Sequence, residues 1–229
     1  MKTETQINNG GANMARRSFL RYAGAGAAAI GVLTAAACHK DHNVTPTSAT
    51  IDVGTGDVGI LNYAYALEQL EAAFYTQVIA TPYTGITASE TLNLTAIRDH
   101  EVLHREFFKT ALGTSAIASL SVDFSSIDFT SRASVLGAAK AFEDLGVTAY
   151  DGIAYKIVTV AYLGFAGAIV SVEARHAAYI SDLITAGSFS PSDQVSATTG
   201  LNITNTPPTV LQAANTYLKT KVTFNSFTA

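Results

Sequence analysis

The sequence has no tryptophan, one cysteine and few charged residues, and each shortage excludes a class of protein. One cysteine among 229 residues excludes an internal disulfide framework, and without a Cys-x-x-Cys pair it also excludes a thiolate zinc site. Fourteen Lys and Arg against 18 Asp and Glu leave a net charge of −4, so the basic surface that nucleic acid requires is missing. With 48% hydrophobic and 14% charged residues, the chain is too apolar to be disordered. We expect one globular domain with tails and no nucleic-acid partner.

Residues 1–37 have the pattern of an export signal. The segment Arg16-Arg17-Ser18-Phe19-Leu20-Arg21 precedes an apolar run over 22–37 that is made almost wholly of small and aliphatic residues. This run of about 16 residues is shorter than the ~20 that span a bilayer, which disfavours a transmembrane anchor. The paired arginines before Phe19 and Leu20 resemble the twin-arginine signal, which implies export of a folded protein.

The apolar run ends at Cys38, and Ala35-Ala36-Ala37-Cys38 is similar to a bacterial lipobox, with Ala35 where leucine is usual. Lipidation of Cys38 and ordinary cleavage after small residues both remain open. The resemblance implies a periplasmic protein or a membrane-anchored lipoprotein that touches the membrane only through its signal or lipid. Residues 38–56 lack apolar periodicity and predict a tether, in which His39 and His42 are interpreted as solvated side chains.

Apolar residues at helical spacing predict an all-α domain of four helices over residues 57–187. The first helix is expected to start at Asp57 as its N-cap and to end before Pro82 and Gly85. The second is expected to start at a capping box of Thr87 with Glu90 and to end at Gly113. The apolar stripe of the third runs from Leu136 to Tyr150, and that of the fourth runs from Tyr162 to Leu183 and stops near Gly187.

The stretch between the second and third helices is long. Residues 113–131 show no helical stripe and predict a crossover that can run the full length of a bundle. We expect the helix directions up, down, long crossover, up, down. The turn between the last two helices is predicted near Val158, although Gly152 suggests an earlier helix end. Residues 188–229 predict a Thr- and Asn-rich tail with one weak helical piece over 210–219.

Each predicted helix carries a carboxylate where its apolar stripe should continue, because steps of three, four and seven residues return to one helix face. The residues are Glu68 and Glu143 as single glutamates, and Glu101/His104 and Glu173/His176 as Glu-x-x-His pairs. A buried carboxylate without a partner costs several kcal/mol, and no Lys or Arg lies on these stripes. Two metal ions would supply the missing positive charge, with carboxylates bridging them and one imidazole on each ion.

The motifs Glu68-x6-Tyr75, Glu101-x-x-His104, Glu143-x6-Tyr150 and Glu173-x-x-His176 resemble the ferritin-like di-iron carboxylate superfamily, whose ligand set they match in order. The resemblance covers residues 58 to about 187. It implies a ferritin-like four-helix bundle with the long crossover between helices two and three, around a dinuclear Fe or Mn centre. It also implies that Tyr75 and Tyr150 hydrogen-bond the ligand carboxylates. Residues 61–75 and 172–176 are similar to the desiccation-related ferritin-like proteins of bacteria and plants.

Two further residues lie next to these motifs. Glu71 is interpreted as a surface residue or a neighbour of the ligands, because Tyr75 follows Glu68 at the matching spacing. His100 is adjacent to Glu101, and we expect it to point away from the site as a solvated or locally bonded side chain.

A dinuclear Fe or Mn centre in a water-excluding bundle suits redox chemistry with O2 or peroxide, as an oxidase, ferroxidase, peroxidase or catalase-like enzyme. The alternative is a stress-protective or cell-surface scaffold in which the metal holds the bundle together. Iron storage in a cage is disfavoured, because residues 188–229 do not resemble a short fifth helix. The ligand types accept both metals, so the sequence does not choose between Fe and Mn, and the oligomeric state stays open.

Overall fold

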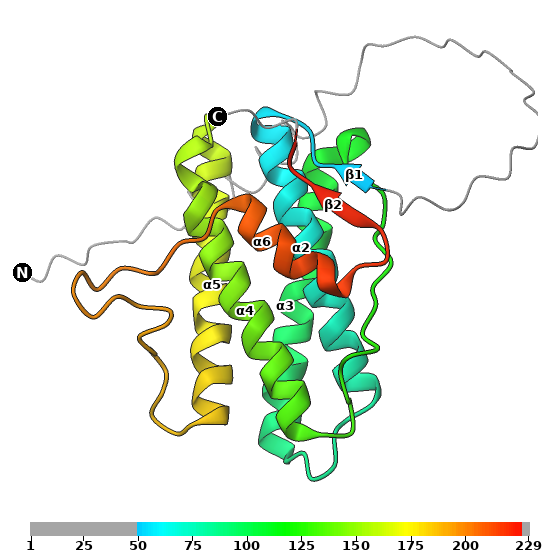
Figure 1. Ribbon diagram of the computed structural model, residues 1–229, viewed down its shortest axis with the longest axis vertical. Coiled ribbons are helices and arrows are strands. Elements are labelled where there is room, and N and C mark those ends of the chain that lie inside the picture. Colours follow the sequence, from blue (N-terminus) through cyan, green and yellow to red (C-terminus); the bar gives the residue numbers. More distant parts are fainter. Residues whose placement is uncertain (1–49, 226–229) are drawn as a thin grey trace, which may run out of the picture. The chain divides into compact units, whose positions relative to one another are not determined.

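The structure is a computed structural model that describes residues 50–225, and its main body is a bundle of four long helices (Figure 1). These helices are α2 (Gly56–Ala80), α3 (Ala88–Leu112), α4 (Arg132–Ile153) and α5 (Val160–Ile184). The predicted all-α bundle is confirmed. The export signal, Cys38 and most of the tether lie outside the described residues. None of the helices between residues 50 and 225 combines the length and apolarity needed to cross a membrane.

The second helix begins and ends as its sequence signals predict. The Thr87 hydroxyl accepts a hydrogen bond from the Glu90 backbone N–H, and the Glu90 carboxylate accepts one from the Thr87 N–H, which completes the capping box. Gly113 ends α3 with a φ of 54°, in the left-handed region that favours glycine.

Helix α2 begins at Gly56, and Asp57 is not its N-cap as the sequence predicted. Thr55 occupies that position, and Asp57 lies in the first turn of α2. Its carboxylate instead accepts hydrogen bonds from the backbone N–H groups of Val158 and Thr159, at 2.9 and 2.8 Å. Asp57 thus ties the start of α2 to the turn before α5, at the position of the chain where that turn was predicted.

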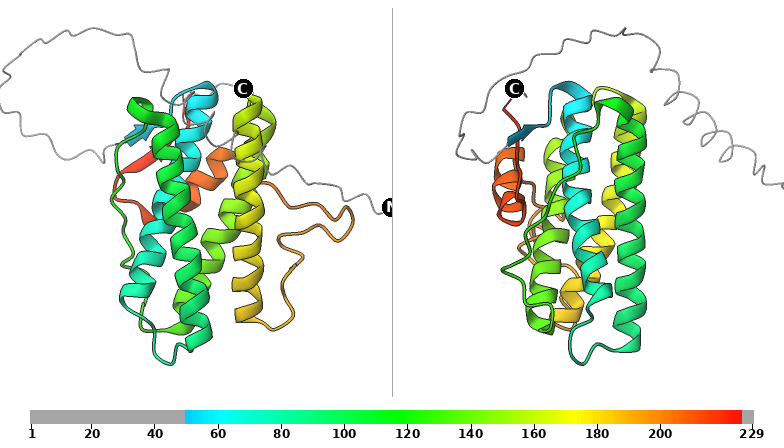
Figure 2. Two further views of the ribbon diagram at one scale, coloured as in Figure 1. Left: turned by 180° about the vertical axis from the view of Figure 1, so that it is seen from behind. Right: turned by 90° about the vertical axis from the view of Figure 1, so that its right-hand side faces the viewer.

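The expected alternation of helix directions is wrong. Figures 1 and 2 show that the crossover over residues 113–131, apart from the short 3-10 helix η1 (Gly113–Ser115), runs the length of the bundle. A connection of that length starts α4 at the end where α3 started, so α4 runs parallel to α3, and α5 returns antiparallel. As a result α2 and α4 are antiparallel to each other.

The last part of the predicted C-terminal tail packs on the bundle. It contains α6 (Pro207–Ala214), η3 (Asn215–Tyr217) and β2 (Lys221–Thr223), and a further 3-10 helix, η2 (Ala154–Lys156), follows α4. Helix α6 crosses α2 and α4 and buries Val210, Leu211 and Ala214 (Figure 1). The helical piece expected over 210–219 is thus present with shifted bounds, as α6 followed by η3.

Two features of this packing lie outside the reach of sequence periodicity. Part of the predicted tether over 38–56 forms β1 (Thr50–Asp52), which pairs in parallel with β2. Gly152 lies inside α4, where a Cβ would lie 2.0 Å from the backbone oxygen of Asn205. The glycine therefore admits the C-terminal segment and does not end the helix.

The core is centred on α2, which is buried on almost every side because α3, α4, the crossover and α6 surround it. Its largest fully buried side chains include Tyr63, Phe74 and Tyr75, and Phe74 contacts Phe142 edge to face. Apolar residues therefore surround the polar side chains that α2 points into the bundle.

Candidate metal centre

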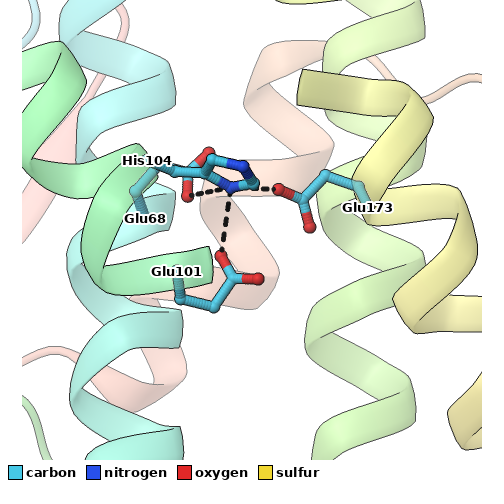
Figure 3. A group of neighbouring side chains, drawn as sticks. All are labelled: Glu68, Glu101, His104 and Glu173. Atoms are coloured by element: carbon cyan, nitrogen blue, oxygen red, sulfur yellow. Dashed lines mark ion pairs between the residues drawn. The ribbon is translucent and has the colours of Figure 1, made fainter. Parts of the chain in front are cut away.

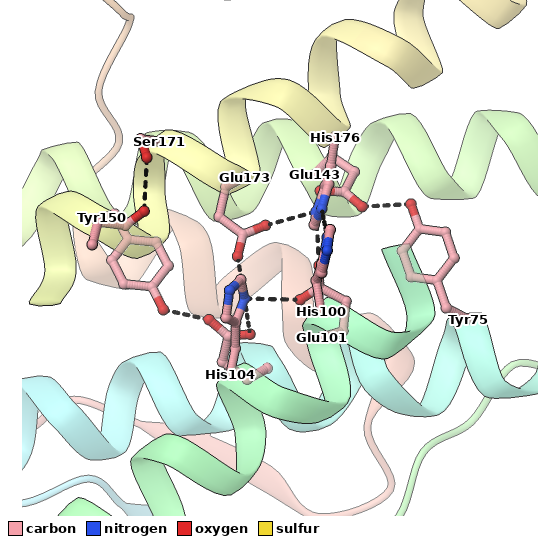
Figure 4. Close-up of polar contacts among 11 residues, drawn as sticks. Tyr75, His100, Glu101, His104, Glu143, Tyr150, Ser171, Glu173 and His176 are labelled. Carbon is pink, nitrogen blue, oxygen red and sulfur yellow. Dashed lines mark hydrogen bonds and ion pairs between the residues drawn. The ribbon is translucent and has the colours of Figure 1, made fainter. Parts of the chain in front are cut away.

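Six predicted side chains from all four long helices converge inside the bundle and form two overlapping groups (Figures 3 and 4). The first group is Glu68, Glu101, His104 and Glu173, and the second is Glu101, Glu143, Glu173 and His176. Within each group, one ligand atom per residue lies within 4.8 Å of all the others. The helical spacing of the sequence explains this convergence, since each side chain continues the apolar stripe of its helix.

Glu101 and Glu173 belong to both groups. Each of these carboxylates directs one oxygen toward the histidine of the first group and its other oxygen toward the histidine of the second. His104 Nδ1 lies 2.9 Å from Glu173 Oε1 and 3.6 Å from Glu101 Oε2. His176 Nδ1 lies 2.8 Å from Glu101 Oε1 and 3.5 Å from Glu173 Oε2. Glu101 and Glu173 therefore have the arrangement of carboxylates that bridge two ions.

The two single glutamates each enter one group and are held by a tyrosine from the opposite half of the chain. Glu68 Oε2 lies 3.4 Å from Nδ1 of His104, and Glu143 Oε2 lies 3.5 Å from Nδ1 of His176. Their other oxygens accept hydrogen bonds, Glu143 from Tyr75 at 2.5 Å and Glu68 from Tyr150 (Figure 4). Each tyrosine thus fixes one oxygen and leaves the other facing the centre.

The atoms that face the centre have no hydrogen-bond partner of suitable geometry within the described residues. They are Glu68 Oε2, Glu143 Oε2, both oxygens of Glu101 and Glu173, and Nδ1 of His104 and His176. All four carboxylates are fully buried. Buried polar atoms normally have partners, and eight of them around one point are what a site for positive ions requires.

The electrostatics of the site lead to the same conclusion. Burial raises the pKa of Glu143 to about 8 and raises that of Glu68 well above its ordinary value, in spite of the nearby histidines. Burial lowers the pKa values of His104 and His176, but the surrounding carboxylates outweigh it and raise both to about 12. The cluster therefore attracts positive charge, and protons supply that charge where metal does not.

The donor set fits two ions of a metal that accepts both oxygen and nitrogen ligands. Four carboxylates neutralise the four positive charges of two divalent ions, and each ion receives one imidazole nitrogen. Fe and Mn accept this combination of ligands, whereas the thiolates that select other metals are lacking among the buried side chains of the described residues.

His100 is an exposed side chain, as expected, but it does not point away from the site, so that part of the expectation is wrong. Its Nδ1 lies 2.9 Å from Nε2 of His176, and the two rings are stacked with centroids 5.1 Å apart. If Nδ1 of His176 held an ion, its Nε2 would carry a proton and could donate a hydrogen bond to His100. His100 thus lies where it can orient the His176 ring, and sequence spacing gave no indication of this because the contact joins α3 to α5.

Glu71 is not a surface residue, because its exposed fraction is 3%. It lies on α2 one turn beyond Glu68, and four other glutamates raise its pKa together with burial. The surface interpretation is wrong, and Glu71 is a neighbour of the ligands. Its spacing of three from Glu68, on an almost wholly apolar helix, was the signal for this.

Comparison with known families gives the class of protein. The family model of the ferritin-like domain matches residues 56–186, which include all four long helices and all six residues of the two groups. The chain belongs to the ferritin-like family. A search of curated proteins finds no significant match to it.

Proposed function

We propose that this protein holds a dinuclear Fe or Mn centre on Glu68, Glu101, His104, Glu143, Glu173 and His176, and that it carries out redox chemistry with O2 or peroxide. The observation that carries the proposal is the sharing of Glu101 and Glu173, each with one oxygen toward His104 and one toward His176. Such sharing is the arrangement expected of carboxylates that bridge two ions close together.

A bound pair of such ions supplies one electron each and a binding position for O2 or peroxide. The chain's own residues provide the setting. The carboxylates are buried, so the bundle excludes bulk water from the centre. Tyr75 and Tyr150 hold Glu143 and Glu68 in orientation by hydrogen bonds.

A small apolar cavity near the proposed centre favours a small apolar substrate. It has a volume of about 20 Å³, roughly that of one water molecule, and reaches Tyr150, whose hydroxyl donates to Glu68. Its lining includes Leu61, Leu67, Phe108, Ile153 and Phe165. Its apolar lining is compatible with the entry of a small apolar molecule such as O2.

The proposal extends to the location of the protein. The twin-arginine pattern at Arg16 and Arg17 suits a protein that takes up its metal in the cytoplasm and is exported folded. Lipidation of Cys38 would then anchor the bundle at the periplasmic face of a membrane. The sequence similarity to desiccation-related proteins supports the alternative, a stress-protective scaffold in which the metal holds the bundle together.

Metal analysis of protein purified without added metal, followed by peroxide-turnover and ferrous-oxidation assays, tests the proposal. We expect two ions of Fe or Mn per chain and turnover above that of the free metal. Fewer than two ions after reconstitution would overturn the dinuclear centre. If two ions are bound but neither peroxide nor ferrous iron is turned over, the redox activity is contradicted and the metal-stabilised scaffold becomes the favoured function.

A further inference from the structure

The turn between α4 and α5 carries the three large apolar side chains that are most exposed among the described residues. Tyr155, Val158 and Val160 have exposed fractions of 78%, 84% and 81%. A single exposed apolar side chain needs no explanation, but a concentration of them in one turn marks a surface of interaction. Neither the core nor the candidate metal centre uses these side chains.

Two neighbouring helices extend this surface. The Asp57 carboxylate accepts hydrogen bonds from the N–H groups of Val158 and Thr159, which holds the turn against the start of α2 (Figure 1). Val58 in the first turn of α2 and Leu163 at the start of α5 are 45% and 43% exposed. All of these apolar side chains thus lie at one end of the bundle. We call them the apolar end surface, which consists of Val58, Tyr155, Val158, Val160 and Leu163.

The charge around this surface is low and positive. Between Asp151 and Glu173 the only charged residue is Lys156, whose amine lies 5.7 Å from the ring centroid of Tyr155. A tyrosine and a lysine beside aliphatic side chains suit the boundary between lipid headgroups and acyl chains. There the ring and the lysine stem can be buried while their polar tips reach the headgroups.

The backbone of the turn is also suited to contact with lipid. Backbone polar groups that enter the apolar part of a bilayer need partners within the protein. The N–H groups of Val158 and Thr159 donate to the Asp57 carboxylate, and the N–H of Ile157 donates to the carbonyl oxygen of Ala154 at 3.1 Å. The turn therefore presents apolar side chains on a backbone whose donors at these positions are already bonded.

The chain enters the bundle at this same end. The described chain begins with β1 at Thr50, and α2 starts at Gly56, beside the turn. The stretch of about a dozen residues between Cys38 and Thr50 spans at most about 40 Å. The opposite end of the bundle lies one helix length, roughly 37 Å, farther away. If Cys38 carries a lipid, the apolar end surface can rest on the membrane with a relaxed tether, whereas the opposite end would need an almost fully extended one.

We propose that the apolar end surface docks on the lipid bilayer, with Tyr155, Val158 and Val160 at the level of the headgroups. This inference rests on the proposed location of the protein and goes beyond the lipid anchor, because the folded domain itself contacts the membrane. A bilayer is preferred over a second copy of the chain, since the tether enters at this end and the tyrosine and lysine suit headgroups.

A fluorescent reporter tests the docking, because the chain has no tryptophan of its own. The full chain carrying Val158→Trp is added to vesicles of phosphatidylethanolamine and phosphatidylglycerol. We expect its emission to shift to shorter wavelength and to be quenched by lipids brominated on their acyl chains. Leu92→Trp is the matched control, since Leu92 is 71% exposed near the start of α3, at the opposite end. It should show neither effect, and a Val158→Trp chain that behaves like it would overturn the inference.

A second set of variants tests which side chains insert. In the chain with Tyr155→Trp as reporter, adding Val158→Asp and Val160→Asp should abolish the shift and the quenching, because carboxylates are costly to bury in lipid. Both valines are more than 80% exposed, so the fold should persist, as circular dichroism would show. Leu201→Asp, at a 68% exposed position between α5 and α6, should leave both signals intact. Equal quenching in all these chains would contradict insertion of this surface.

The outcomes separate the docking from the proposed location. If fatty-acid labelling tags Cys38 but Val158→Trp stays unquenched in vesicles, the anchor stands and only the docking is overturned. If no label is found but Val158→Trp is quenched, the anchor fails and the docking stands. An emission shift without vesicles in a chain that sediments as a dimer would show that a second copy covers the surface, which overturns the inference.

Discussion

The hydroxyl of Tyr75 on α2 donates a 2.5 Å hydrogen bond to Glu143 on α4, 68 residues away in the chain. Tyr150 on α4 makes the reciprocal hydrogen bond to Glu68 on α2. The two bonds are compatible only with antiparallel helices, since each tyrosine lies seven residues beyond the glutamate of its own helix. They join the two halves of the bundle at the centre itself.

Replacing these tyrosines should weaken both the fold and the metal site. Tyr75→Phe or Tyr150→Phe leaves a buried carboxylate oxygen without its donor, which costs about 1–3 kcal/mol in the free energy of unfolding. Metal affinity should fall about 10–100-fold, as for other groups that orient metal ligands. Denaturant unfolding and chelator competition measure the two effects. Tyr155→Phe, at a side chain that is 78% exposed, is the control and should change neither.

Removing either shared carboxylate should release metal. Glu101→Ala and Glu173→Ala each take one oxygen from both groups, so we expect the loss of at least one ion and of all redox activity. Metal analysis of the purified variants measures this. The matched control is Glu106→Gln on α3, an exposed residue paired with Arg105. Retention of two ions in both alanine variants would show that neither carboxylate bridges.

Chelation should destabilise the bundle. Without ions, the buried carboxylates repel one another, and the free energy of metal binding to the folded state is lost. We expect the thermal unfolding midpoint to fall after treatment with a chelator and to recover when Mn²⁺ or Fe²⁺ is restored. An unchanged midpoint would mean that the bundle is indifferent to metal.

The start of α3 should lose stability in acid. Burial raises the pKa of Glu90, but hydrogen bonds from Thr87 and Arg132 outweigh it, so the folded-state pKa is below the ordinary value. The stabilisation by the Glu90 carboxylate is thus complete above the unfolded-state pKa and is lost as the pH falls through the folded one. Glu90→Gln should lower the free energy of unfolding at pH 7 by about 1 kcal/mol. The difference from wild type should disappear as the pH falls through the lowered folded-state pKa of Glu90. Denaturant unfolding at several pH values measures this, and a difference that persists in acid would contradict the carboxylate's role.

Processing at Cys38 has its own test. If this residue becomes the lipid-bearing N-terminus, metabolic labelling with a fatty acid should tag the wild type and not Cys38→Ser. Labelling of both proteins, or of neither, would contradict lipidation at this position.

Replacing Arg16 and Arg17 by lysine should hold the protein in the cytoplasm, as fractionation would show, if export uses the twin-arginine route.

The sequence by itself determined the elements that depend on local spacing. Helical periodicity places Glu101 and His104 on one face of α3, and Thr87 with Glu90 marks where that helix begins, because these interactions join residues three or four apart. The four carboxylates on apolar stripes could be predicted to meet, because the stripes of a bundle have nowhere else to be buried.

Only the tertiary structure decided the relationships between distant segments. The direction of α4 depends on the path of the crossover, which lacks a periodic pattern. The contact of His100 with His176 joins two helices, and the burial of Glu71 depends on the space at Gly146. The pairing of β1 with β2 joins the two ends of the described chain. Periodicity reports which side of a helix is buried, whereas the neighbours of a buried side chain depend on packing between residues far apart in sequence.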